Sequence, residues 1–260
     1  MKETFEALSA SAIGKKTTLE RSKLSYLLIT GLGGIFVGFG VIILITIGGL
    51  LDPAGVPSMK IVQGVSFGIA LSMVLLGGAD LYTGNNLIMT VGALEKRTTW
   101  GDLRNVWAFS WIGNFMGSIV VAFLFFMAGL ASGETGAYIE KLAGIKMNAT
   151  FIELFFRGIL CNILVCMAVW SCYKVKNEAA KILMIFCCIY PFITAGFEHS
   201  VANMTLFSLA LMIPHGELVS VGGAAHNLIA VSLGNAVGGA IFIGLTFWYS
   251  QMRNQSGKLK

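Results

Sequence analysis

Long runs of apolar residues, separated by short polar segments, dominate this chain of 260 residues. A helix needs about 20 apolar residues to cross the hydrocarbon core of a bilayer. Six runs reach that length: residues 26–50, 61–94, 105–131, 151–173, 181–213 and 227–249. No strand pattern, with alternating apolar and polar residues, competes with them. The pattern predicts an all-α integral membrane protein with six transmembrane helices.

The second and fifth runs are the longest, at about 33 residues each, and each carries a polar cluster. The clusters read GADLYTGN, from Gly78, and GFEHSVAN, from Gly196. Such runs exceed what a straight helix needs, and glycine supplies backbone freedom where a helix is interrupted. We therefore predict that helices 2 and 5 are broken, each into two half-helices joined by a loop.

The two polar clusters belong to a duplication of the chain. Matching residues occupy identical offsets: Gly78, Asp80 and Asn85 in the first cluster, and Gly196, Glu198 and Asn203 in the second. Each cluster is also followed by a glycine-asparagine motif, GNFMG from Gly113 and GNAVG from Gly234. Because each half holds three spans, the second half must be upside down relative to the first. The sequence thus predicts a 3+3 inverted repeat, in which paired interruptions mark a transport path.

Composition and charge agree with a membrane protein. Hydrophobic residues make up 56% of the chain, charged residues 12%, and the mean hydropathy is +0.79. Of the 18 Lys and Arg residues, 14 fall on one side of the six spans; Lys60, Lys141 and Lys146 fall on the other, and Arg157 lies within a span. Cytoplasmic segments retain such an excess, so we expect both termini to be cytoplasmic in a multi-pass protein of the inner (plasma) membrane. The net charge of +5 follows from this topology and does not indicate a nucleic-acid partner.

The spans form one channel domain, residues 26–250, between an N-terminal segment, 1–25, and a C-terminal cytoplasmic tail, 251–260. The first segment has no apolar core, so a cleavable signal is not expected. Phe5, Leu8 and Ile13 could line one face of a helix on the membrane surface, and a solvated tail is the alternative.

Ionisable residues within the broken spans are the first candidates for chemistry. A charged residue at mid-membrane depth costs about 2.5 to 3.5 kcal/mol on insertion scales. Asp80 and Glu198 could have a structural role, capping the exposed donors of a half-helix N-terminus. His199 could instead meet an anion, because an imidazole gains or loses a proton near neutral pH.

Three further polar residues have both a functional and a structural interpretation. Asn162 and Thr83 could donate hydrogen bonds to a passing anion, or could make packing bonds between helices. Lys146 could concentrate anions at an entrance, or could be an interfacial lysine whose ammonium group reaches water.

No pattern for enzymatic chemistry is present. The five cysteines, without a CxxC pair, are expected to be buried thiols, and His215 and His226 are not spaced as metal ligands. Phosphate-binding loops and HExxH are missing. We therefore expect no catalytic residue, no cofactor and no metal.

Four motifs resemble signatures of the formate/nitrite transporter family, over about Leu24 to Tyr249: GADLYTGN, FFRGILCNILVCMAVW, GFEHSVANM and SLGNAVGG. This resemblance implies an aquaporin-like fold assembled as a homopentamer in the lipid bilayer, with a pore in each protomer. It also implies that the substrates are small inorganic or organic monovalent anions of weak acids. The family's functional residues fall on His199, Asn162, Thr83 and Lys146, and its apolar constrictions on Phe67, Leu71, Leu81 and Phe192.

A mechanism follows from these residues as a hypothesis. A bare anion loses its hydration in an apolar constriction, at a much larger cost than its neutral acid. Lys146 would gather the anion, which would gain a proton from or through His199 and cross as the neutral acid. Asn162 and Thr83 would supply hydrogen bonds, and Glu198 would hold the histidine and the loop.

The substrate is less sharply indicated than the family. The short loop between spans five and six, and the segments HSVANMTLFSLAL and AHNLIAVSLGN, favour hydrosulfide or nitrite over formate, with lactate behind all three. One alternative is a neutral-solute channel like the aquaglyceroporins, although their Asn-Pro-Ala loop pair is missing. Another is a membrane scaffold that transports nothing.

Overall fold

The computed structural model describes residues 1–256, so Lys258 and Lys260, assigned above to the cytoplasmic side, lie outside the described residues. The described part is helical throughout and confirms the all-α prediction. Its elements are α1 (Lys2–Arg21), α2 (Lys23–Leu51), α3 (Met59–Ser66), α4 (Gly68–Leu76), α5 (Tyr82–Leu94), α6 (Trp100–Met127), α7 (Gly133–Met147), α8 (Phe151–Lys174), α9 (Glu178–Ala195), α10 (Ser200–Met212), α11 (Val221–Val237), a π-helix η1 (Gly238–Leu245) and α12 (Thr246–Ser256).

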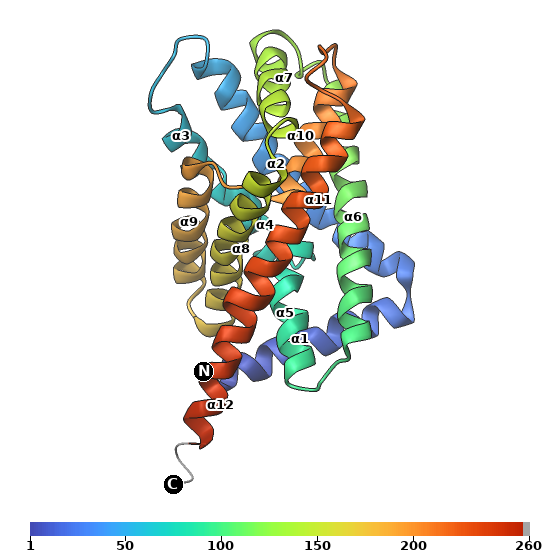
Figure 1. The fold of residues 1–260 in the computed structure, drawn as a ribbon, viewed down its shortest axis with the longest axis vertical. Helices are drawn as coiled ribbons and strands as arrows, with labels where there is room; N and C mark the ends of the chain where they lie inside the picture. The colour runs from blue at the N-terminus through green and yellow to red at the C-terminus, as the bar shows by residue number, and fades with distance from the viewer. Residues whose placement is uncertain (257–260) are drawn as a thin grey trace.

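Five helices in the described part are long and apolar enough to cross a membrane: Lys23–Leu51, Met59–Leu76, Trp100–Met127, Phe151–Lys174 and Val221–Met252. The fifth run of the sequence, residues 181–213, does not form one long span. It is divided between α9 and α10, and α10 is an apolar helix of 13 residues. Most of these helices run along the length of the molecule (Figure 1).

Both predicted interruptions are present. The helix that ends at Leu76 resumes as α5 at Tyr82, and the helix that ends at Ala195 resumes as α10 at Ser200. Gly78 has φ +73° and Gly196 has φ +78°, values in the left-handed region that favours glycine. These turns let each chain segment leave one helix and enter the next inside the protein.

Two helix crossings hold the loops in place, and glycines allow both. Where α2 crosses α6, a Cβ on Gly117 would overlap the carbonyl oxygen of Gly31. Where α8 crosses α11, a Cβ on Gly234 would overlap the carbonyl oxygen of Phe155. Small residues therefore permit backbone-to-backbone contact at both crossings.

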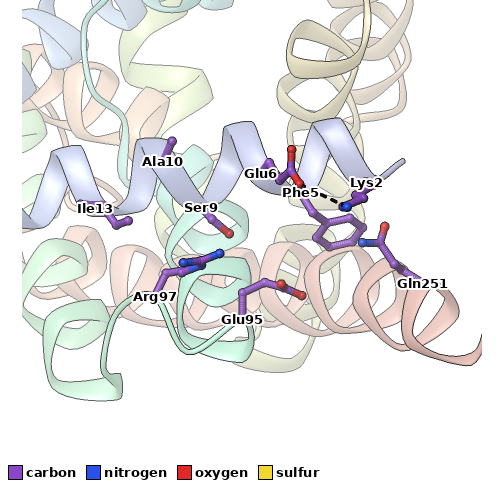
Figure 2. Close-up of a pocket in the computed structure, with 9 residues that line it drawn as sticks. All are labelled: Lys2, Phe5, Glu6, Ser9, Ala10, Ile13, Glu95, Arg97 and Gln251. Atoms are coloured by element: carbon purple, nitrogen blue, oxygen red, sulfur yellow. Dashed lines mark ion pairs between the residues drawn. The ribbon is translucent and has the colours of Figure 1, made fainter. Parts of the chain in front are cut away.

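The N-terminal segment is a helix that crosses one end of the bundle and packs against α5 (Figure 1). Phe5 and Leu8 are buried, and the Phe5 ring meets Trp170 edge to face at 5.1 Å between centroids. Ile13, grouped with them on one face in the sequence, is exposed instead. Figure 2 shows Phe5, Glu95, Arg97 and Gln251 around a hollow of about 310 Å³ between α1, the turn after α5, and α12.

Candidate functional site

The two broken helices bring Thr83 and His199 together in the interior. Thr83 is the second residue of α5, and His199 is the N-cap of α10. The Oγ1 atom of Thr83 lies 3.1 Å from Nε2 of His199, and both side chains are buried. A contact between residues 116 positions apart thus joins the two polar clusters of the sequence.

The second ring nitrogen of His199 determines where the ring proton lies. Its Nδ1 atom accepts the backbone N–H of Ala202 at 3.2 Å, which caps α10. A nitrogen that accepts a hydrogen bond carries no proton, so the neutral ring has its proton on Nε2. Nε2 then donates to Thr83 Oγ1, and a second proton on Nδ1 would break the cap.

Asn114 of α6 holds the loop before α5. Its Oδ1 atom accepts the N–H of Tyr82 at 2.8 Å, and its Nδ2 atom donates to the carbonyl oxygens of Thr30 and Asp80 at 2.7 and 2.9 Å. These three bonds fix the loop relative to α2 and α6. The sequence pointed to Asn114 only as part of the repeated GN motif.

Asn235 of α11 holds the other loop in the same way. Its Oδ1 atom accepts the N–H of Ser200 at 3.0 Å, and its Nδ2 atom donates to the carbonyl oxygens of Gly158 and Glu198 at 2.8 and 3.0 Å. The GN motifs therefore have a shared physical role: each asparagine satisfies the backbone groups of a broken helix.

Each loop carboxylate has a lysine partner. Lys146 Nζ of α7 lies 2.8 Å from Glu198 Oε1, and Lys15 Nζ of α1 lies 2.6 Å from Asp80 Oδ1. Sequence reasoning found Lys146 and missed Lys15, which it assigned to the N-terminal segment. The repeat contained a signal: if Glu198 pairs with a lysine, its counterpart Asp80 should also have a cation partner.

The remaining carboxylate contacts differ from the expectation for Glu198. Its Oε2 atom accepts from Asn203 at 2.6 Å, so its two oxygens face Asn203 and Lys146. The imidazole of His199 is held by Thr83 and Ala202 instead. Glu198 therefore holds the loop by its side chain and backbone, without bonding the histidine ring.

Asn162 connects the same loops from α8. Its Nδ2 atom lies 3.2 Å from the carbonyl oxygen of Thr83, 3.0 Å from Asn86 Oδ1, and 2.6 Å from the carbonyl oxygen of Asn235. Its Oδ1 atom is buried without a protein hydrogen-bond partner. Asn162 therefore orients Thr83 through the backbone rather than contacting His199.

Aromatic side chains cover one side of the histidine. The Phe192 ring stacks on the His199 ring with 6.1 Å between ring centroids and an interplanar angle of 24°. Phe67 meets Phe192 edge to face with 5.7 Å between centroids. A cavity of about 40 Å³ at this position is lined by Phe67, Phe192, His199 and also Phe197, which sequence reasoning missed. Leu71 and Leu81 are buried in the same apolar cluster.

Two larger hollows lie at opposite ends of this interior site. One, of about 500 Å³, is lined by Lys146 and Glu198; we call it the Lys146 hollow. The other, of about 220 Å³, is lined by Lys15, Asp80 and Leu81; we call it the Lys15 hollow. Their lysines belong to α7 and α1, which lie at the two ends of the bundle (Figure 1). Within the described residues, no group of His, Cys, Asp and Glu could hold a metal ion.

Apolar spanning helices, two charged hollows and a buried polar contact between them define a membrane protein of the channel and transporter class. The chain belongs to the formate/nitrite transporter family, whose model matches residues 2–249. It is similar to the nitrite transporter NirC of Escherichia coli (strain K12), with 37% identity over 250 residues, 95% of this chain and 91% of that protein.

Solved structures show the same family likeness. An FNT family ion channel superimposes with a TM-score of 0.91 at 35% identity, covering 96% of this chain and 99% of that one. A pentameric formate channel with formate bound superimposes with a TM-score of 0.77 at 25% identity, covering 90% of this chain and 99% of that one. The family expected from the sequence motifs is confirmed.

Proposed function

We propose that this protein is a channel for small monovalent anions of weak acids, in which His199 links anion passage to protonation. The observation that supports it best is the buried contact between Thr83 Oγ1 and His199 Nε2, placed between two hollows that each contain a lysine. Relatives named for nitrite transport and for bound formate agree with this substrate class.

The mechanism runs through the proton on Nε2. An anion enters the Lys146 hollow, where the lysine stabilises its charge, and then approaches the ring of Phe192 and loses water. Losing hydration is far more costly for the anion than for its neutral acid, which raises its proton affinity. The anion takes a proton from hydronium in the Lys146 hollow while Nε2–H of His199 donates a hydrogen bond to it, directly or through Thr83 Oγ1. The ring stays neutral, and the neutral acid crosses the apolar segment.

The broken-helix frame fits an inverted repeat of aquaporin-like form. Asn114 and Asn235 make equivalent contacts in the two halves, as do Lys15 with Asp80 and Lys146 with Glu198. We further propose an inner-membrane homopentamer with both termini cytoplasmic, from the positive charge bias of the loops and the pentameric formate channel it resembles. In that orientation the Lys15 hollow faces the cytoplasm.

Nitrite and hydrosulfide rank ahead of formate among the candidate substrates. The 37% identity to NirC supports nitrite. The short loop between spans five and six, with the segments HSVANMTLFSLAL and AHNLIAVSLGN, supports hydrosulfide or nitrite over formate. The neutral-solute alternative is not favoured, since the relatives reported above are named for nitrite, formate or ions.

The test uses the purified protein in liposomes loaded with a pH-sensitive dye. Nitrite, hydrosulfide, formate, lactate or glycerol is added outside, and empty liposomes give the background leak of neutral acids. His199→Asn is the informative variant, because asparagine retains a cap for α10 but has no imidazole. His226→Asn, at an exposed histidine that bonds the carbonyl of Ala149, is its control.

We expect anion-driven dye responses in the wild type and the His226 variant, and a fall of at least tenfold in the His199 variant. General acid–base groups typically contribute 10²–10⁴-fold to a rate, which sets this scale. Unchanged rate and pH dependence in His199→Asn would exclude the proton-linked mechanism. Swelling in glycerol without any anion response would exclude the substrate class.

A further inference from the structure

The two ends of the site share a common design but differ in charge at one pair of matching positions. In one half, the N–H of Asp80 bonds the carbonyl oxygen of Ile29 at 3.4 Å; in the other, the N–H of Glu198 bonds the carbonyl oxygen of Arg157 at 3.3 Å. Ile29 and Arg157 are therefore structural counterparts. One is apolar and the other carries a permanent positive charge.

Arg157 is placed to act on the Lys146 hollow. It lines this hollow together with Lys146 and Glu198, and its side chain is 41% exposed. Its Nη2 atom lies 3.6 Å from Glu153 Oε1, a long contact with a half-exposed carboxylate. Glu153 is not among the residues that line the hollow, so the guanidinium is the member of this weak pair that faces it.

The charges of the two hollows are unequal as a result. In the Lys146 hollow, both carboxylates have lysine partners: Asp52 bonds Lys141 at 2.7 Å, and Glu198 bonds Lys146 at 2.8 Å. Two further cations, Arg157 and Lys60, line the same hollow. In the Lys15 hollow, the charged lining residues are Lys15 and Asp80, which bond each other.

We propose that Arg157 is a specificity-determining residue that makes the two ends of the pore unequal toward anions. It raises the anion concentration in the Lys146 hollow and lowers the half-saturating concentration for entry from that end. This inference rests on the proposed function. The transport barrier lies deeper in the protein, at His199 and the aromatic rings, so Arg157 stabilises the anion in the hollow and leaves kcat/KM unchanged.

The test measures nitrite and formate flux in proteoliposomes whose protein orientation has been determined, in both directions and at two ionic strengths. Arg157→Gln removes the charge, and Arg157→Lys retains it. Arg104→Gln is the matched control, because Arg104 is an exposed arginine on the first turns of α6, near the opposite end. The backbone carbonyl that bonds Glu198 is unchanged in every variant.

For entry from the Lys146 end at low salt, we expect Arg157→Gln to raise KM about two- to threefold, the effect of one charge at about 8 Å in a water-filled hollow. The maximal rate of entry from the Lys146 end should rise by the same factor, because kcat/KM of a passive pore must be equal in the two directions. KM and the maximal rate of entry from the Lys15 end should not change. The salt dependence of KM at the Lys146 end should weaken, because screening acts on the charge that was removed. Arg157→Lys and Arg104→Gln should behave as the wild type.

Equal changes at both ends, or no change at either end while the wild type carries anions, would overturn this inference and leave the proposed function standing. A wild type that carries no anion would remove the proposed function itself. A misfolded Arg157→Gln would show a lower maximal rate in both directions, which the inference does not allow. Arg157→Lys, which retains the charge, would then show whether the loss of charge or a change in packing caused the defect.

Discussion

His199 uses its two ring nitrogens for different purposes. Nδ1 accepts from the backbone of Ala202 and caps the start of α10, while Nε2 meets Thr83 in the protein interior. The fold therefore holds the ring in a single orientation and a single neutral tautomer. Nε2–H can donate a hydrogen bond while the cap at Nδ1 stays intact.

The capping role predicts a difference between two variants at this position. His199→Ala removes the cap of α10 and should lower stability by about 1 kcal/mol, while His199→Asn should retain most of it. For a chain of this size, that corresponds to a fall of roughly 2–4 °C in the melting temperature in detergent. Identical melting temperatures for the two variants would show that the bond to Ala202 does not stabilise α10.

Individual residues also show where sequence reasoning succeeds. The repeat identifies Asp80 and Glu198 as candidate site residues. A charged residue within an apolar run is easy to recognise, and its recurrence at the same position of the second half makes it easier still. The sequence does not identify Lys15 as a site residue, because its partner Asp80 lies 65 residues away and nothing in the neighbouring sequence indicates that α1 packs against α5. The direction of a side chain such as Glu198, toward Lys146 rather than His199, depends on tertiary contacts that periodicity does not contain.

At the scale of elements, the glycine crossings position the helices that hold the site. The loops before α5 and α10 are bonded to Asn114 and Asn235, and these asparagines lie on the helices that cross α2 and α8 at backbone distance. A shift of either crossing by a fraction of an ångström would move a loop that the pore depends on.

We expect Gly117→Ala to destabilise the protein by about 1–3 kcal/mol, the usual cost of overpacking, because its Cβ would overlap the carbonyl of Gly31. Gly14→Ala is the control: Gly14 lies on α1 with no atom within 4 Å of the added Cβ. This second change should be neutral or stabilising by about 0.5–1 kcal/mol, from helix propensity. Melting curves in detergent measure both, and equal effects would exclude the close crossing as the cause.

The two breaks are predictable from sequence, because the length of the apolar runs and the placement of glycine reveal them, whereas hydropathy alone does not. Residues 181–213 read as one long apolar run, and the structure divides them at Gly196 into α9 and α10. Hydropathy averages over a window and therefore does not register a turn of four residues within an apolar segment.

At the scale of the whole molecule, large apolar side chains remain exposed on the outside of the bundle. Examples are Phe39 on α2, Phe123 on α6 and Phe242 in η1, each close to half exposed. Lipid tails and neighbouring protomers both fit such a surface, since neither provides water. A ring of copies would cover part of it and leave each interior site separate.

We expect the protein, purified in mild detergent, to contain five copies of the 27.8 kDa chain. Native mass spectrometry measures this number directly, and a monomer that transports anions would contradict the pentamer while leaving the pore in place. Mixing wild type with His199→Asn provides a second measurement: if each protomer has its own pore, flux should fall in proportion to the variant fraction.

The π-helix η1 has a consequence for insertions and deletions. An α-helix turns by about 100° for each residue, so removing one residue between Gly238 and Leu245 would rotate everything after it by about that angle. Gln251, which faces the hollow beside Phe5 (Figure 2), would then turn away from α1. The residue count of this segment is thus constrained more tightly than the identity of its apolar side chains, and homologous chains should differ there by substitution rather than by length.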